Sequence, residues 1–177
     1  MCAVPVPGFD RPLELILQVH RRIEHRCALM GRLVEHLAER GCDADARATA
    51  GHIVRFFDED VARHHEDEEL EFYDAVVAAA PAPDRARVAA LVARLRSEHA
   101  ELQSLWADAL RPQLVAVQQG RVAWFGGSEI ERCHSLYIEH TTRENDELLP
   151  LAEAFLTSAQ LEQLGRGMAA RRGRPYP

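Results

Sequence analysis

The chain contains a run of two histidines and four acidic residues, His64-His65-Glu66-Asp67-Glu68-Glu69, in which imidazole and carboxylate side chains recur four positions apart. Residues four apart lie on one face of an α-helix. The run therefore presents His65 beside Glu69, or His64 beside Glu68. If that face is buried, the pair needs a strong partner, because burying charge without compensation is costly. A metal ion is the natural candidate.

Three other apolar stripes at helical spacing each carry a histidine near the middle. His20 interrupts the first stripe, His99 the third, and His140 the fourth, with Glu144 four positions after His140. In an up-down-up-down bundle these mid-helix positions come to one level. Two carboxylates can each bridge two ions, and nitrogen and oxygen ligands without thiolate suit iron or manganese, with zinc also possible. The candidate ligands are His20, His65, Glu69, His99, His140 and Glu144.

The run on the second stripe can be read in two registers. We prefer His65 and Glu69, because apolar residues on both sides of the run, among them Phe72 and Val76, share their face at α-helical spacing. His64 and Glu68 are the alternative, either as ligands or as partners that orient the ligands. Three other acids in and just after the run are expected on a solvated helix face: Glu66, Asp67 and Glu71.

Four long amphipathic helices must position these side chains. The first runs from about residue 12 to Gly41, and the second from about 45 to 80, where Pro81 stops it. Asp84 is a plausible N-cap of the third helix, which Pro112 should kink or end. Ser128-Glu-Ile-Glu131 is a capping box that opens the fourth, which Pro150 should kink or end near Leu149.

A last short helix should follow Thr157 and Ser158 and lead into an arginine-rich tail that we expect to be solvated. No strand pattern occurs in the sequence. The predicted fold is all-α, an up-down-up-down four-helix bundle with a short extra C-terminal helix. The predicted segments are an arm over 1–11, the bundle over 12–156, and a short helix with a basic tail over 157–177.

Composition narrows the function classes. The 177-residue chain has a formal net charge of −7, which argues against a general nucleic-acid surface. Its basic residues are all arginines, so a lysine Schiff base or lysine general base is excluded. No apolar run is long enough to span a membrane, and the first residues do not read as a signal peptide. Scattered cysteines without CxxC spacing favour free thiols, so we expect a cytoplasmic protein.

The motifs together resemble the hemerythrin-like family, also called HHE cation-binding domains. The resemblance covers roughly residues 10–155 and rests on four segments: His20-Arg-Arg-Ile23, His64-His-Glu-Asp-Glu-Glu69 with Phe72-Tyr73, Glu98-His99, and His140-Thr-Thr-Arg-Glu144 before Leu148-Leu-Pro150. It implies two non-haem iron ions with an oxo or hydroxo bridge, rather than manganese or zinc. On this reading Glu69 and Glu144 bridge the ions, and the four histidines are terminal ligands.

Two positions depart from the oxygen-carrying members of that family. Leu95 stands where those proteins place a further histidine, and His140 and Glu144 are four rather than five residues apart. A smaller ligand set leaves open positions for O2, NO or peroxide, which are the expected small-molecule partners. The alternative is a di-iron enzyme or iron donor in the nitric-oxide or oxidative stress response, or in iron–sulfur cluster repair. Whether the protein is an enzyme stays open.

Overall fold

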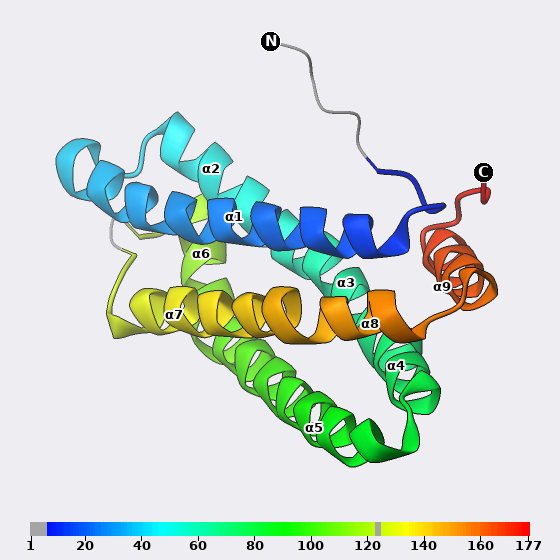
Figure 1. Cartoon of the computed structure of the whole chain (residues 1–177). Helices are drawn as coiled ribbons and strands as arrows, with labels where there is room; N and C mark the ends of the chain where they lie inside the picture. The colour runs from blue at the N-terminus through cyan, green and yellow to red at the C-terminus, as the bar shows by residue number, and fades with distance from the viewer. Residues whose placement is uncertain (1–6, 123–124) are drawn as a thin grey trace, which may run out of the picture. The chain divides into compact units, whose positions relative to one another are not determined.

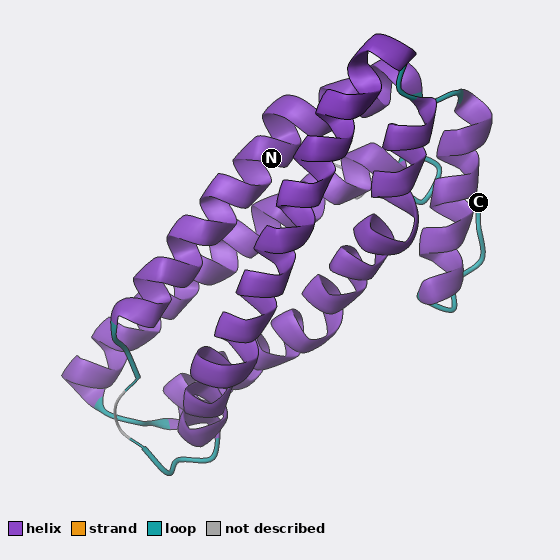
Figure 2. Cartoon of the chain, turned by 90° about the horizontal axis from the view of Figure 1, so that it is seen from below, coloured by secondary structure: helices purple, strands orange, loops and turns teal. Residues whose placement is uncertain are grey.

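The computed structural model describes residues 7–122 and 125–177, and within these ranges every regular element is a helix. Figure 2 shows helices and loops, with no strand in the part of the chain that is described. The prediction of an all-α fold is confirmed, while the up-down-up-down arrangement and the segment boundaries stay predictions. Residues 1–6 of the predicted arm lie outside the described residues. Among the described helices, none is both long and apolar enough to cross a bilayer.

The described residues form five continuous helical stretches, several of which include π turns with their wider i→i+5 hydrogen bonds. Figure 1 follows them along the chain by colour. In order, the elements are α1 (Pro12–Arg40); α2 (Ala44–Arg55), η1 (Phe56–Val61), α3 (Ala62–Asp67), η2 (Glu68–Phe72) and α4 (Tyr73–Ala79); α5 (Ala82–Leu105), η3 (Trp106–Leu110) and α6 (Arg111–Gln118); α7 (Ser128–Arg143), η4 (Glu144–Leu148) and α8 (Leu149–Phe155); and α9 (Ser158–Arg171).

The helix ends follow local sequence signals. Gly41 stops α1 in the left-handed region at φ +73°, where a side chain would be strained. Asp43 then caps α2, because its Oδ1 accepts a 2.9 Å hydrogen bond from the backbone N–H of Ala46. At α9, Thr157 and Gln160 form a capping box. The predicted start of the last helix is confirmed.

The helix boundaries differ from the expectations near Asp84, and in part near Pro112 and Pro150. Asp84 is not an N-cap, because α5 already begins at Ala82. Pro112 and Pro150 end no helix, because a π turn comes shortly before each of them and the helix continues. A proline ring normally collides with the carbonyl four residues earlier. The wider turn moves that carbonyl aside, so the chain stays helical through both prolines.

The chain divides into two compact units. The first comprises Met1–Arg21, Arg63–Arg96 and Thr142–Pro177. Its apolar core draws on α1, on the stretch from η2 to α5, and on the C-terminal helices. The buried members of this core are Ile16, Phe72, Tyr73, Val76, Ala80, Val88, Val92, Leu95, Leu148, Leu149, Ala152, Leu156, Leu164 and Met168.

The second unit comprises Arg22–Ala62 and Ser97–Thr141. Within it α2 packs against α6. An aromatic group forms part of its interior: the rings of Phe57 and Trp106 stack with centroids 4.6 Å apart, and Tyr137 lies 5.7 Å from Phe57. The indole N–H of Trp106 donates to Asp58 at 3.0 Å, so the only polar group of the ring is satisfied.

Candidate metal centre

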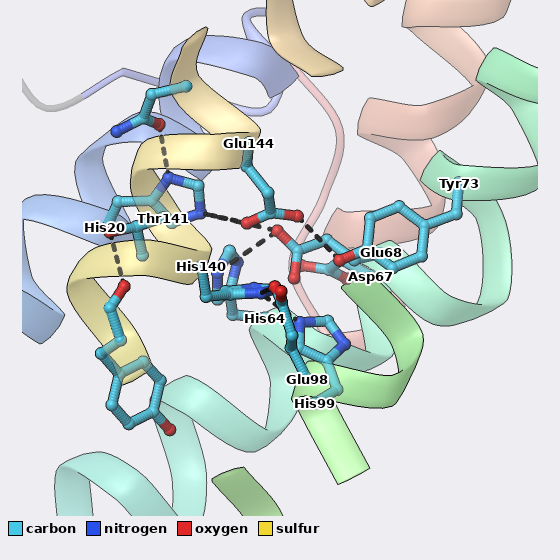
Figure 3. Close-up of polar contacts among 12 residues, drawn as sticks. His20, His64, Asp67, Glu68, Tyr73, Glu98, His99, His140, Thr141 and Glu144 are labelled. Atoms are coloured by element: carbon cyan, nitrogen blue, oxygen red, sulfur yellow. Dashed lines mark hydrogen bonds and ion pairs between the residues drawn. The ribbon is translucent and has the colours of Figure 1, made fainter. Parts of the chain in front are cut away.

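The first unit holds four buried polar side chains in one cluster: His20 from α1, His64 from α3, Glu68 from η2 and Glu144 from η4. Each is at most 2% exposed. One nitrogen or oxygen atom of each lies within 4.8 Å of the others. Figure 3 shows these side chains pointing toward one another. Two carboxylates this deep in an apolar interior require positive charge beside them.

The contacts in the cluster converge on the two carboxylates. Nε2 of His20 lies 3.1 Å from Oε2 of Glu144 and 3.6 Å from Oε1 of Glu68. Nε2 of His64 lies 3.3 Å from the same Glu68 oxygen. Two imidazole nitrogens and two carboxylate oxygens thus face a common point, which is the arrangement that a bound cation needs.

Asn145 orients the His20 ring. Nδ1 of His20 lies 2.7 Å from Oδ1 of Asn145. Because an amide oxygen only accepts, Nδ1 carries a proton, so in the neutral ring Nε2 presents its lone pair. That Nε2 atom is buried and makes no hydrogen bond, although it faces both carboxylates. Histidines that bind metal ions in proteins are usually held in this way, by a hydrogen bond from the ring nitrogen that does not bind the ion.

The charge around His20 favours a cation at that nitrogen. Burial lowers the pKa of His20, but the neighbouring carboxylates of Glu144 and Glu68 outweigh burial and raise it from 6.5 to about 10. A proton and a metal ion compete for the same lone pair. The cluster therefore attracts positive charge to Nε2.

Tyr73 holds the other side of Glu144. Its buried hydroxyl donates a 2.7 Å hydrogen bond to Oε1 of Glu144, which leaves Oε2 facing His20. Burial, together with the carboxylates of Glu68 and Glu144, raises the pKa of Tyr73 far above its ordinary value. The phenol consequently stays protonated and acts as a donor. From the sequence, Tyr73 stood out only as part of the Phe72-Tyr73 motif, and Asn145 did not stand out.

Both carboxylates open a π turn. Glu68 is the first residue of η2 and Glu144 the first of η4. The backbone N–H of Tyr73 bonds to the carbonyl of Glu68, and that of Leu149 to the carbonyl of Glu144, each five residues back. π turns are rare overall, but those that occur are often found at functional sites. The equivalent placement of both acids indicates that these turns set their direction.

On the second helical stretch the buried face is not the one that the preferred register expected. His64 and Glu68 occupy the buried cluster, whereas His65 and Glu69 are only partly buried. Glu69 is instead paired with Arg96, its Oε2 3.0 Å from the guanidinium Nε. At α-helical spacing His65 lies two turns before Phe72. Because η2 takes one more residue in its turn, the position two turns before Phe72 is His64.

The second unit holds a buried pair of imidazoles. His99 on α5 and His140 on α7 are 5% and 1% exposed, and their Nε2 atoms are 3.0 Å apart. Nδ1 of His140 donates to Oε2 of Glu98 at 3.1 Å, so Nε2 of His140 presents its lone pair toward His99. Glu98 plays here the role that Asn145 plays for His20. The sequence signal that could have indicated this role is the position of Glu98 directly before His99.

The other histidines lie apart from these groups. His25, His52 and His134 are exposed, in agreement with their position off the apolar stripes. His36 pairs with Asp43, its Nε2 2.9 Å from Oδ1, at the start of α2. That contact supports the helix cap, because Asp43 is the capping residue.

The residues present fit a metal ion. The donors are imidazole nitrogen and carboxylate oxygen with no thiolate, a set suited to iron, manganese or zinc. Asn145 orients the His20 ring through Nδ1, and the buried Nε2 of that ring makes no hydrogen bond. Nε2 is therefore the atom that such an ion would satisfy. No rearrangement of the backbone is needed to bring the four donors together.

Comparison with known proteins agrees with this chemistry. The sequence model of the hemerythrin HHE cation binding domain matches residues 11–152. An uncharacterised protein of Haemophilus influenzae is similar to this chain, with 25% identity over 164 residues that span 93% of this chain and 91% of that protein. The family match covers most of the chain and all six buried histidine and glutamate positions described above. The chain belongs to the hemerythrin HHE cation-binding domain family.

Proposed function

We propose that this protein is a non-haem di-iron protein that binds or senses O2, NO or peroxide. In this proposal the two carboxylates that would hold the ions are Glu68 and Glu144, and the imidazoles that would hold them are His20, His64, His99 and His140. The helices would be arranged as an up-down-up-down bundle around them. The observation that carries the proposal is the buried cluster of His20, His64, Glu68 and Glu144, whose ligand atoms lie within 4.8 Å of one another.

The chain's own residues would fix the shape of this centre. Asn145 holds His20 by Nδ1, and Glu98 holds His140 in the same way. Tyr73 donates to Oε1 of Glu144, which leaves Oε2 facing His20, where it would be available to an ion. Contacts behind the ligands raise ligand basicity and fix ring orientation. Iron, when bound, would supply ferrous–ferric redox chemistry and open coordination positions.

Leu95 supports a centre that is open to small molecules. It is fully buried within the apolar core of the first unit and offers no donor atom. The oxygen-carrying members of the family place a histidine at this position, so the present ligand set is smaller. The residues that share this core with Leu95, such as Phe72 and Leu148, are apolar, which would suit an uncharged diatomic ligand or peroxide at an open coordination position.

An open coordination position on iron would also suit a second candidate function, a di-iron enzyme or iron donor in the nitric-oxide or oxidative stress response. The two candidates differ in what happens to the small molecule. Steady-state consumption of peroxide or NO with a defined oxidised or reduced product supports an enzyme. A stable complex that forms and dissociates without product supports a binding or sensing protein.

Anaerobic reconstitution with Fe(II) tests the proposal. The full chain is loaded under argon, freed of excess metal and analysed for iron, and its ultraviolet–visible spectrum is recorded before and after O2. We expect two iron ions per chain and oxo-bridge charge-transfer bands after oxidation. A chain that retains no iron under these conditions would contradict the proposed function.

A matched pair of variants locates the site. Glu68→Ala removes a buried carboxylate of the cluster, so it should abolish most iron binding. Glu69→Ala removes the neighbouring carboxylate, which pairs with Arg96, so it should leave iron content unchanged. Equal iron content in the two variants would show that the cluster is not the metal site.

A further inference from the structure

A buried carboxylate lies directly before Glu68 and is held by the C-terminal helix. Asp67 is 2% exposed, although the sequence suggested a solvated face. Its Oδ1 lies 2.6 Å from Nε of Arg171, and its Oδ2 lies 2.7 Å from a terminal nitrogen of Arg172. Each oxygen of the Asp67 carboxylate therefore contacts a different guanidinium group. The expectation of a solvated basic tail is wrong for these two arginines.

Arg171 also reaches the following helical turn. Its NH2 nitrogen lies 2.7 Å from Oε2 of Glu71 while its Nε contacts Asp67. Asp67 precedes η2 and Glu71 is inside it, so one planar guanidinium spans the turn that Glu68 begins. A lysine ammonium, as a single point charge on a flexible stem, does not reproduce this two-sided contact.

Two glycines allow α9 to come this close. A Cβ at Gly167 would lie 1.9 Å from Oε2 of Glu71, and a Cβ at Gly165 would lie 2.0 Å from the carbonyl oxygen of Phe9. Met168, on the same helix, is fully buried in the core that includes Phe72. The helix is thus fixed by apolar packing on one side and by the arginine contacts on the other.

A π turn needs such support. Its i→i+5 geometry is uncommon in proteins, so contacts from other elements must favour it over a regular α-helical turn. For η2 those contacts come from Arg171 at both ends of the turn and from the Tyr73–Glu144 hydrogen bond just after it. If η2 became α-helical, the residues before Phe72 would shift in register, and Glu68 would leave the cluster.

We propose that Arg171 and Arg172 are positioning residues of the metal centre. Through Asp67 and Glu71 they hold η2 in its π form, so that Glu68 faces His20 and His64. Release of α9 would lower metal affinity without removing any ligand. This inference rests on the proposed metal centre, since Glu68 is a ligand only there.

A double-mutant cycle on the full chain tests the inference. The variants are Asp67→Asn, Arg171→Ala and the two combined, with the exposed Arg174→Ala as the matched control. Fe(II) and Zn(II) affinities are measured by competition with a chelator. We expect each single variant to weaken binding about tenfold or more, at the low end of the usual range for residues behind metal ligands. The two residues share one contact, but Arg171 also binds Glu71 and Asp67 also binds Arg172. The loss in the combined variant should therefore be smaller than the sum of the two single losses.

Two further measurements separate positioning from general stability. Amide hydrogen exchange over residues 68–73 should accelerate in the metal-free Arg171→Ala protein and stay unchanged in Arg174→Ala. Arg171→Lys keeps the charge but loses the two-sided contact, so it should not restore affinity. If Arg171→Ala does not fold, Asp67→Asn carries the test, because it preserves the size of the side chain.

The outcomes distinguish this inference from the proposed function. Unchanged exchange over residues 68–73 together with unchanged metal affinity would overturn the positioning role, whatever metal the wild type holds. Additive losses in the combined variant would also overturn it. A wild-type chain that binds no metal would contradict the proposed function and, with it, the consequence for affinity, while the exchange measurement still decides whether α9 holds η2.

Discussion

Tyr73 connects the two carboxylate-bearing turns. Its hydroxyl donates to Oε1 of Glu144 at 2.7 Å, and its backbone N–H bonds to the carbonyl of Glu68. Glu68 and Glu144 lie 76 positions apart in the sequence but are tied to one residue. The position of Glu144 thus depends on the π turn that begins at Glu68.

Tyr73→Phe should loosen this connection. The variant leaves Oε1 of Glu144 buried without its phenolic donor, which costs about 1–3 kcal/mol of unfolding free energy in the metal-free protein. Urea unfolding followed by circular dichroism measures that loss. Iron affinity should also fall by roughly 10- to 100-fold. Tyr176→Phe, near the C-terminus, serves as the control and should stay within about 0.5 kcal/mol of wild type.

Asn145→Ala should weaken metal binding without removing a ligand. The His20 ring loses the acceptor that fixes its orientation, so affinity should fall by about tenfold or more in a chelator competition. Asn145→Asp keeps an acceptor at the same place and should retain affinity. The exposed Asp146→Ala is the control on the same turn. A loss of the same size in Asp146→Ala would rule out a specific role for Asn145.

Glu98→Ala should affect the imidazole pair of the second unit. His140 loses its Nδ1 partner, so the proposed second ion should bind more weakly, by roughly 10- to 100-fold. Iron content after gel filtration should fall below two per chain. Glu101→Ala, an exposed acid of the same helix that pairs with Arg132, should keep the wild-type content. Full iron content in Glu98→Ala would exclude this role.

Metal loading should stabilise the fold. An ion that binds only the folded chain adds about 2.7 kcal/mol at a free concentration one hundred times its Kd. For a chain of this size that corresponds to a rise in Tm of about 5–10 °C. Thermal unfolding of the metal-free and Fe(II)-loaded protein, both under argon, measures the difference. An unchanged Tm at saturating Fe(II) would be incompatible with binding inside the buried cluster.

Much of the helical layout was predictable from local signals. Gly41 and the Thr157–Gln160 capping box mark helix ends by rules that involve neighbouring residues only. The family assignment was predictable as well, because it depends on the order of short motifs rather than on side-chain directions. His20, His99, His140 and Glu144 are all buried, as the stripes indicated.

The register of the second helical stretch was not predictable from α-helical periodicity. The extra residue of η2 shifts the buried face from His65 and Glu69 to His64 and Glu68. That turn depends on Arg171, which is 104 positions from Asp67 in the sequence. Contacts such as Asn145 with His20 and Tyr73 with Glu144 likewise join distant segments, so no local pattern announces them.

Iron anomalous scattering from crystals of the Fe(II)-loaded protein tests the central claim most directly. We expect anomalous peaks bonded to Nε2 of His20 and Nε2 of His64 and to the carboxylates of Glu68 and Glu144, with Glu69 still paired to Arg96. Peaks bound instead by His65 and Glu69, or no peak at the buried cluster in iron-containing crystals, would contradict it.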